Sequence, residues 1–417
     1  MRVLFTTTGH SGHLLPLAPL ARANERAGHE VAVAAQASRV AAVEGAGLAA
    51  FALDEAPDAA WEPLMRQLAE ARQPEADRLA IADGFARIHG RAALPGAVRL
   101  LEAWRPDVVV HEGYEVAGPL AAERLGIPTV RVALGLASTE RWLSRLARPA
   151  VDELRGTLGP PRDHGGARRR RTPLVSAVPL GLDDGPAHRF RTPRPDAAPP
   201  LPDWWERPAD PLVYLTFGSV SGSLPIFPEL FRRALDAVAP LPVRVLLTVG
   251  RGADLSALGP LPANVHAEPW LAQEDVLPHA AAVVGHGGYG TTLGALAHGV
   301  PLVLLPLFAG DQWRNARRVA QLGAGLMLED GERLAIALPG PTVMAALPAA
   351  VERVLAEPRF RRTARRIAAD IAALPPVDDA VALIERAVRG RAAAPAGALA
   401  RRARARPSAD AARGWAA

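Results

Sequence analysis

The chain of 417 residues contains no cysteine and no lysine. Without cysteine it cannot form disulfides, use a thiolate nucleophile or hold zinc or an iron–sulfur cluster through thiolates. Without lysine it cannot form a Schiff base, anchor pyridoxal phosphate or build a Walker-type phosphate loop. Aromatic residues are few, at 5%, but hydrophobic residues make up 49% of the chain. This composition is typical of a globular protein, and the length suffices for two domains with sizeable cores.

Long apolar runs are also missing, since no stretch approaches the roughly 18 apolar residues that span a bilayer. The N-terminus runs directly into a short strand-like segment, 3–5, and lacks the apolar centre and cleavage site of a signal peptide. These absences predict a cytoplasmic protein with no membrane partner.

Charge is balanced outside one terminal segment. The formal net charge is +5, and this excess lies in residues 390–417, which hold six arginines and one acidic residue. That segment is rich in alanine, arginine and proline, so we predict a disordered basic tail. The remaining body is neutral, which argues against a nucleic-acid partner.

Short apolar runs alternate with longer Ala-, Leu- and Arg-rich segments, a pattern typical of an α/β fold with parallel sheets. The pattern starts again after a stretch with seven prolines, 191–211, which cannot form a helix interior or a central strand. We therefore predict two doubly wound Rossmann-like domains, 1–190 and 212–389, that face a cleft and are joined by a stiff linker at 191–211. The expected strands are 2–8, 30–35, 107–111 and 128–133, and then 212–217, 243–248, 282–285 and 301–306.

The strongest local motif is a glycine-rich turn between an apolar strand and a helix, at 281–293. Such a turn lets the backbone approach a phosphate, and the helix N-terminus after it offers unpaired N–H groups. A histidine within the turn can also donate a hydrogen bond to a phosphate oxygen. We therefore expect an anion to be bound here by His286, Gly287, Gly288, Gly290 and Thr291.

The same turn also fits a dinucleotide fingerprint. Gly285, Gly287 and Gly290 match G-x-G-x-x-G, and Asp311 follows about 20 residues later. An NAD(P)-dependent oxidoreductase is therefore the alternative hypothesis, although the sequence offers no clear hydride-transfer site for it.

Two further segments of the second domain would complete a nucleotide site. Ser219 lies in a Gly-Ser turn after strand 212–217, at the carboxyl end where open α/β sheets bind ligands. Trp270 offers a flat face on which a nucleobase can stack, and Gln273 follows it closely.

In the first domain, His13 follows the first strand in a turn flanked by glycines, and Pro16 favours a helix start just after it. The ordinary pKa of histidine suits a general base that deprotonates a hydroxyl. Such a base needs an acid that orients its other ring nitrogen. Glu112 and Glu115, at the end of strand 107–111, are the two candidates, and the sequence leaves the choice open.

In their order along the chain, these motifs resemble the nucleotide-sugar-dependent glycosyltransferases of the two-domain GT-B fold. The similarity is greatest to the family 1-type bacterial branch that decorates macrolides, polyketides and other natural products. It covers roughly residues 1–389. The matching segments are 12–16, 26–31, 106–112 and 118–123 in the first half, and 270–273, 277–279, 286–291, 299–301, 306–312, 315–316 and 323–325 in the second.

The resemblance implies an inverting glycosyltransferase of the hexosyltransferase type. It would move a sugar from a dTDP- or UDP-sugar to a hydroxyl of an apolar aglycone, without a metal or a cofactor. His13 would be the base and Glu112 the acid that orients it. The implied donor-binding residues are Ser219, Trp270, Gln273, His286, Gly287, Gly288, Gly290, Thr291, Asp311 and Gln312, the last two at the sugar.

The acceptor is expected against the first domain, beside the segments 51–100 and 134–175, which we interpret as loops. His10, Trp61 and Phe85 are its candidate contacts. The sequence does not settle the sugar, the acceptor, or whether the enzyme is a monomer or a homodimer.

Overall fold

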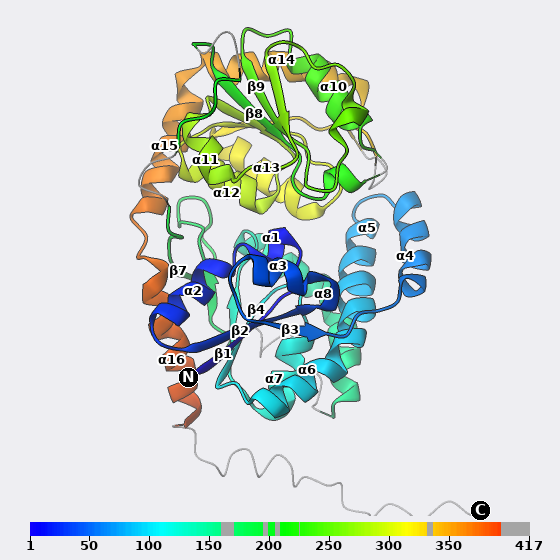
Figure 1. Cartoon of the computed structure of the whole chain (residues 1–417), viewed down its shortest axis with the longest axis vertical. Helices are drawn as coiled ribbons and strands as arrows, with labels where there is room; N and C mark the ends of the chain where they lie inside the picture. Colours follow the sequence, from blue (N-terminus) through cyan, green and yellow to red (C-terminus); the bar gives the residue numbers. More distant parts are fainter. Residues whose placement is uncertain (160–170, 195–198, 205–208, 225, 332–336, 393–417) are drawn as a thin grey trace, which may run out of the picture.

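The computed structural model describes residues 1–159, 171–194, 199–204, 209–224, 226–331 and 337–392. The predicted tail from residue 393 onward and two parts of the predicted linker, 195–198 and 205–208, lie outside these residues. The chain forms two α/β halves stacked along the long axis of the molecule (Figure 1).

Each half is built on one parallel sheet. The first sheet has the order β3-β2-β1-β4-β5-β6-β7 and the second β10-β9-β8-β11-β12-β13, so the predicted pair of doubly wound domains is confirmed. The strands of the first sheet are β1 (Arg2–Thr6), β2 (Glu30–Gln36), β3 (Ala50–Leu53), β4 (Val108–Glu112), β5 (Thr129–Val132), β6 (Leu174–Ser176) and β7 (His188–Arg189). Those of the second are β8 (Leu212–Thr216), β9 (Arg244–Thr248), β10 (Val265–Glu268), β11 (Ala282–Gly285), β12 (Leu302–Leu304) and β13 (Gly325–Met327).

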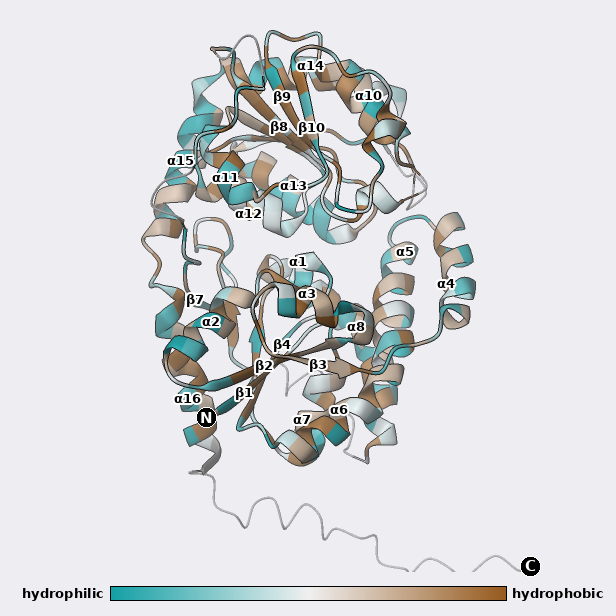
Figure 2. Cartoon of the chain, in the orientation of Figure 1, coloured by the Kyte–Doolittle hydropathy of each residue, from teal (hydrophilic) through white to brown (hydrophobic). Residues whose placement is uncertain are grey.

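Helices cover both faces of each sheet, which is why the central strands are apolar along their whole length. Strands β8 and β9 are mainly brown in Figure 2, whereas the outer helices carry teal patches. The helices of the first half are α1 (Ser11–Leu14), α2 (Ala18–Arg26), α3 (Val40–Gly45), α4 (Asp58–Glu70), α5 (Glu75–Arg78), the π-helix η2 (Leu79–His89), α6 (Gly90–Trp104), α7 (Ala117–Leu125) and α8 (Ala137–Thr157). They are followed by α10 (Glu229–Val238), α11 (Gln273–Val276), α12 (Tyr289–Ala297), α13 (Gly310–Leu322), α14 (Pro341–Ala356), α15 (Pro358–Ala372) and α16 (Val381–Ala392).

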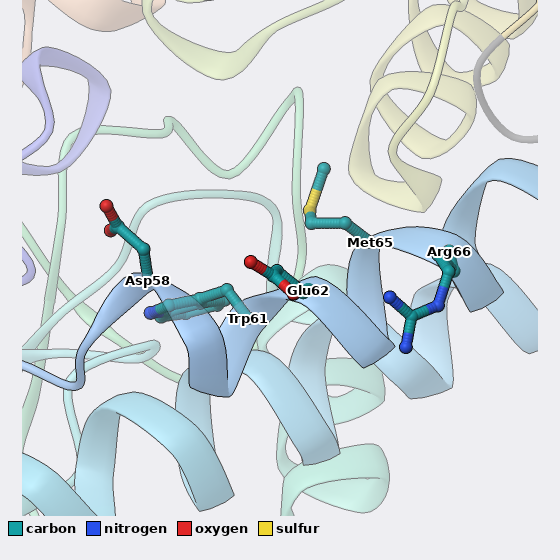
Figure 3. A pocket seen from close by; sticks show the side chains of 5 residues that line it. All are labelled: Asp58, Trp61, Glu62, Met65 and Arg66. Atoms are coloured by element: carbon teal, nitrogen blue, oxygen red, sulfur yellow. The ribbon is translucent and has the colours of Figure 1, made fainter.

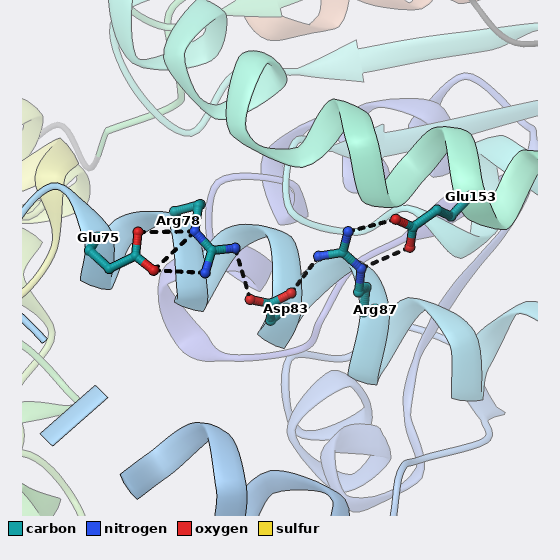
Figure 4. A network of polar contacts seen from close by, with 5 residues as sticks. All are labelled: Glu75, Arg78, Asp83, Arg87 and Glu153. Carbon is teal, nitrogen blue, oxygen red and sulfur yellow. Dashed lines mark hydrogen bonds and ion pairs between the residues drawn. The ribbon is translucent and has the colours of Figure 1, made fainter. Parts of the chain in front are cut away.

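The segments interpreted as loops, 51–100 and 134–175, contain helices instead: α4, α5, η2, α6 and α8. Three of these helices have a proline inside them, which obscures the helical pattern in the sequence. A chain of ion pairs holds α5, η2 and α8 together (Figure 4). It runs through Glu75, Arg78, Asp83, Arg87 and Glu153.

Both sheets reverse their winding direction at one point, between β1 and β4 in the first and between β8 and β11 in the second. The two strands at each of these points are parallel neighbours, so their carboxyl ends lie side by side. Loops that leave such a point diverge, and open α/β sheets bind their ligands there. The segments that follow these four strands are therefore where a site is expected.

The last helix returns to the first half of the molecule. The predicted second domain extends to residue 389, but residues 377–384 pack in the core of the first sheet with Val3, Leu17 and Val108. The two chain segments that connect the halves also run together, because Arg191 N–H donates to Pro375 O at 2.8 Å and Val377 N–H donates to Arg191 O at 3.0 Å. Figure 1 shows α16 beside the chain's N-terminus.

Among the helices in the described part of the chain, none combines the length and apolar character that a bilayer crossing requires.

Candidate active site

The first sheet brings His13 and Glu112 together. His13 lies in α1, directly after β1, and Glu112 ends β4, the parallel neighbour of β1. His13 Nδ1 lies 3.0 Å from Glu112 Oε1. The Glu112 side chain is fully buried, whereas 17% of the His13 side chain is exposed. The pair therefore has a buried acidic end and an imidazole that reaches solvent.

Glu112 is an ionised hydrogen-bond acceptor in this arrangement. Burial by itself would raise the pKa of its carboxyl, but His13 and the backbone N–H groups of Tyr114 and Thr8 outweigh burial and hold the pKa below its ordinary value. A carboxylate only accepts hydrogen bonds, so the Nδ1 atom of His13 carries the proton. Its Nε2 atom then has a free lone pair and can accept a proton from a hydroxyl.

Glu115, the second candidate, has a different place. Its carboxylate accepts hydrogen bonds from Thr6 Oγ1 at 2.5 Å, from Ala117 N at 2.6 Å and from Gly118 N at 3.0 Å. It therefore ties the start of α7 to β1. Burial raises the pKa of this carboxyl to about 7. Glu112, rather than Glu115, is the acid that contacts His13.

Two aromatic rings pack beside His13. The ring centroid of Tyr114 lies 4.9 Å from that of His13, edge-on, and the ring of Phe85 lies at 5.9 Å. Tyr114 was not predicted from the sequence, although its position two residues after Glu112 was the available signal. His10, the N-cap residue of α1, lies 6.2 Å from His13. Burial, together with the nearby charge of Arg39, lowers the pKa of His10 to about 4, so this ring is neutral near pH 7.

Trp61 lies farther from the base, on α4. It packs over Gly84 of η2, where a Cβ atom would lie 3.4 Å from Trp61 Cζ3. Around it α4 forms a hollow of about 330 Å³ (Figure 3). Phe85 and His10 thus lie beside His13, whereas Trp61 packs against η2. The hollow is lined by Asp58, Trp61, Glu62, Met65 and Arg66.

In the second half, His286 follows β11 and packs between two glycines. A Cβ atom on Gly218 would lie 2.7 Å from His286 Cε1, and one on Gly288 would lie 2.4 Å from its Nε2. Both positions therefore require glycine. Burial lowers the pKa of His286 to about 4, which makes the ring neutral near pH 7. Its buried Nδ1 atom has no hydrogen-bond partner among the described residues, and a bound ligand is a natural partner for such an atom.

The turn after His286 leads into the N-terminus of α12. Gly287 has a φ of +86°, and a Cβ atom there would lie 2.7 Å from the carbonyl oxygen of Gln312. Gly288 is the N-cap residue of α12, and no side chain caps the helix. The first turn of this helix, which includes the buried Thr291, thus presents its N–H groups and its positive dipole end. Such a helix end binds anions readily.

The predicted nucleoside-binding residues lie on the two segments next to this turn. Trp270 is 42% exposed, and the guanidinium carbon of Arg251 lies 3.9 Å from its ring centroid. Arg251 was not predicted from the sequence. Gln273 Nε2 donates to Thr291 Oγ1 at 2.9 Å, which ties the start of α11 to the first turn of α12.

The predicted sugar-binding pair begins helix α13. Burial, together with the charge of Asp77, raises the pKa of Asp311 to about 7, and His13 acts in the opposite direction. The Gln312 side chain is only 3% exposed. Its Oε1 atom accepts hydrogen bonds from the backbone N–H groups of Leu307 and Phe308, at 2.8 and 3.1 Å. The side-chain amide oxygen of Gln312 therefore holds the loop that precedes α13.

The two groups of residues meet where the halves face each other. Ser11 Oγ, two residues before His13, donates to Ser219 Oγ at 2.7 Å. Ser219 follows Gly218, which contacts His286. The structure thus brings the predicted base of the first half to the glycine-rich turn of the second.

Comparison with known proteins identifies the family. Residues 22–186 and 232–386 match the N-terminal and C-terminal domains described as erythromycin biosynthesis protein CIII-like. The L-demethylnoviosyl transferase of Streptomyces niveus is 34% identical over 383 residues, which cover 90% of this chain and 95% of the relative. The elloramycin glycosyltransferase ElmGT of Streptomyces olivaceus is 33% identical, over 93% of this chain and 97% of the relative.

Solved structures give the same result. The glycosyltransferase SnogD of Streptomyces nogalater superposes with a TM-score of 0.70 and 28% identity, over 93% of this chain and 99% of that chain. SsfS6 of Streptomyces sp. SF2575, in complex with thymidine diphosphate, gives a TM-score of 0.71 with the same identity and coverage. These matches do not support the alternative hypothesis of an oxidoreductase. The chain therefore belongs to the erythromycin biosynthesis protein CIII-like family and is a natural-product glycosyltransferase with the GT-B fold.

Proposed function

We propose that the enzyme transfers a sugar, with inversion at the anomeric carbon, from a nucleoside diphosphate sugar to a hydroxyl of an apolar aglycone. His13 acts as the general base, and no metal takes part. The observation that carries this proposal is the hydrogen-bonded pair of His13 and Glu112, which faces the glycine-rich turn at His286.

In the proposed reaction, Nε2 of His13 takes the proton of the acceptor hydroxyl. The resulting oxygen attacks the anomeric carbon from the face opposite the diphosphate. The bond between that carbon and the phosphate oxygen breaks, and the nucleoside diphosphate leaves with the electron pair. Glu112 stabilises the imidazolium through Nδ1–H, because it is a buried carboxylate 3.0 Å away.

The diphosphate is proposed to leave toward the N-terminus of α12. His286, Gly287, Gly288, Gly290 and Thr291 are placed there, and Ser219 lies nearby. Preorganised N–H groups and the helix dipole stabilise negative charge that develops in a transition state. This supports a reaction without a metal.

Thymidine diphosphate is the first nucleotide to test and uridine diphosphate the second. The neighbour SsfS6 was solved with thymidine diphosphate, which supports this order. In this chain, the nucleobase would stack on the exposed Trp270 ring, beside Gln273. The sugar would then extend toward Asp311, in the first turn of α13.

The acceptor is proposed to be an apolar and at least partly aromatic aglycone. Phe85 and Tyr114 pack edge to face, with ring centroids 5.0 Å apart and an interplanar angle of 64°, and both flank His13. A flat apolar molecule that lies along these rings presents a hydroxyl to the base.

The test is an assay with thymidine and uridine diphosphate sugars and a panel of polyketide and macrolide aglycones, in the presence of EDTA. We expect transfer in EDTA, with an inverted anomeric configuration in the product by NMR. His13→Ala should lower kcat by at least about a hundredfold while nucleoside diphosphate binding persists. A product with retained configuration, or a fully active His13→Ala variant, would overturn the mechanism.

A further inference from the structure

The first half of the molecule holds the loop that precedes helix α13. Gln73 Nε2 donates to Phe308 O at 3.1 Å, and Gly310 N–H donates to Asp77 Oδ1 at 2.9 Å. These contacts join residues that are 235 and 233 positions apart in the sequence. They belong to the junction between the two halves, and none of their residues is part of the His13–Glu112 pair or of the glycine-rich turn at 285–290.

The contact at Gly310 is tight. A Cβ atom on Gly310 would lie 2.3 Å from Asp77 Oδ2 and 2.8 Å from Trp142 Cζ2. Only glycine permits this approach. Trp142 also stacks with Arg314, one turn further along α13, whose guanidinium carbon lies 4.8 Å from the ring centroid. The start of α13 is therefore fitted to the surface formed by α5 and α8.

Asp77 supplies the hydrogen-bond acceptor that the N-terminus of α13 lacks at its own N-cap position. The N-cap residue of α13 is Ala309, and no side chain of the cap position accepts a hydrogen bond from the helix. The Asp77 carboxylate accepts one of the first N–H groups instead. A carboxylate at this end also interacts favourably with the positive end of the helix dipole. The first half thus caps a helix of the second half.

The capped residue precedes Asp311, the proposed sugar-binding carboxylate. On its inner side the same loop is braced by Gln312 Oε1, which accepts from Leu307 N and Phe308 N. The loop is therefore a rigid unit held by Gln312 from within and by Asp77 from the opposite half. Removing the Asp77 carboxylate leaves the hydrogen bonds of Gln312 intact and removes the hydrogen bond to Gly310 N–H.

Asp77 itself is well fixed. Its side chain is only 8% exposed. The next residue, Arg78, is hydrogen bonded to Glu75 at 2.7 Å and to Asp83 at 3.1 Å. Figure 4 shows this network continuing to α8. The Asp77 carboxylate itself is held by Gln73 of its own half and by Gly310 N–H of the other half.

We infer that Asp77 is a positioning residue for donor recognition: it caps α13 across the junction and so places Asp311 against the sugar when the two halves are together. The inference rests on the proposed function, because it assigns the sugar to the start of α13. Recognition of the sugar would then depend on Asp77 in the first half of the molecule, whereas the nucleoside and diphosphate contacts lie within the second half.

The experiment compares the affinities of thymidine diphosphate and thymidine diphosphate glucose by titration calorimetry. Asp77→Ala should weaken binding of the nucleotide sugar about tenfold and change binding of thymidine diphosphate less than about threefold. Asp77→Asn retains an oxygen that can accept from Gly310 N–H, so it should behave nearly as the parent enzyme. Glu70→Ala, which removes an exposed carboxylate of α4, is the matched control and should change neither affinity.

The same variants are then compared in transfer assays. Asp77→Ala should raise KM for the nucleotide sugar and lower kcat, whereas KM for the acceptor stays the same. Equal weakening of both nucleotides, or an Asp77→Ala enzyme that matches the parent in both titrations, would overturn the inference. If Asp77→Ala does not fold, Gln73→Ala, which loses the contacts to Phe308 and to Asp77, is tested in the same way. An unchanged affinity for the nucleotide sugar in that variant counts against the inference. Absence of transfer by the parent enzyme would instead contradict the proposed function.

Discussion

The Nδ1 atom of His13 lies 3.0 Å from Oε1 of Glu112, a residue 99 positions later in the chain. This relationship depends on the order of the sheet, because β1 and β4 are adjacent parallel strands whose carboxyl ends meet. Glu115, three residues beyond, instead bonds to Thr6 and to the start of α7. The two glutamates thus have different partners: Glu112 contacts His13, and Glu115 contacts Thr6 and the backbone at the start of α7.

This separation predicts different effects for two matched variants. Glu112→Gln should lower kcat about 10²- to 10⁴-fold, because a neutral amide neither fixes the proton on Nδ1 nor stabilises the imidazolium. KM for the nucleotide sugar should stay the same. Glu115→Gln keeps an oxygen that accepts from Ala117 and Gly118, so kcat should be nearly unchanged. Steady-state kinetics of both variants check this, and an equal loss of kcat in the two would contradict the assignment.

The glycines of the turn at 285–290 predict a second contrast. A Cβ atom on Gly290 meets no atom within 4 Å, whereas one on Gly288 would strike His286 Nε2. Gly290→Ala should therefore leave Tm unchanged or slightly higher, since alanine favours a helix, and should weaken thymidine diphosphate about tenfold by filling the space for the phosphates. Gly288→Ala should lower both Tm and affinity. Calorimetry and thermal denaturation measure these effects.

The control for this pair is Gly45→Ala, at the end of α3, where a Cβ atom also meets nothing within 4 Å. It should change neither the affinity for thymidine diphosphate nor kcat. If Gly290→Ala binds thymidine diphosphate like the control, the diphosphate does not lie at the N-terminus of α12.

Much of the fold could be predicted because its strands are buried on both faces. Runs such as 108–110 and 282–284 are apolar throughout and are flanked by helical segments, a pattern that indicates a parallel α/β sheet. The glycine-rich turn could be predicted because close packing against His286 requires glycine. In both cases the physical constraint acts locally, so it is visible in the sequence.

The contacts between distant segments could not be predicted in this way. Nothing near Asp77 in the sequence indicates Gly310, 233 residues away, and both are brought together only by the packing of the two halves. The choice between Glu112 and Glu115 depends on the exact direction of the chain after β4. The return of α16 to the first sheet depends on which apolar surface remains uncovered once both sheets have formed.

Trp270 predicts a measurable contribution of the nucleobase to donor affinity. Its ring is 42% exposed and carries Arg251 on one face. A base that stacks on an aromatic ring contributes about 1–3 kcal/mol, so Trp270→Ala should weaken thymidine diphosphate by about tenfold or more. Trp270→Phe should weaken it less, because a smaller aromatic face remains. Titration calorimetry with thymidine diphosphate and with inorganic diphosphate provides the test. If Trp270→Ala weakens binding of thymidine diphosphate and of inorganic diphosphate equally, the Trp270 ring does not contact the nucleobase.

The raised pKa of Asp311 predicts a pH-dependent stability effect. Burial and Asp77 raise this pKa from 3.8 to about 7. Between these two values the folded protein retains a proton that the unfolded chain has released, so the contribution of Asp311 to stability falls as the pH rises through this window. Asp311→Asn removes the titration. Relative to the parent, its Tm should therefore be higher by about 1–3 °C at about pH 8 and nearly the same at about pH 4. The same variant should also lose affinity for the nucleotide sugar. A gain in Tm with full activity would therefore contradict the role proposed for Asp311. A Tm difference that does not depend on pH would contradict the raised pKa of Asp311.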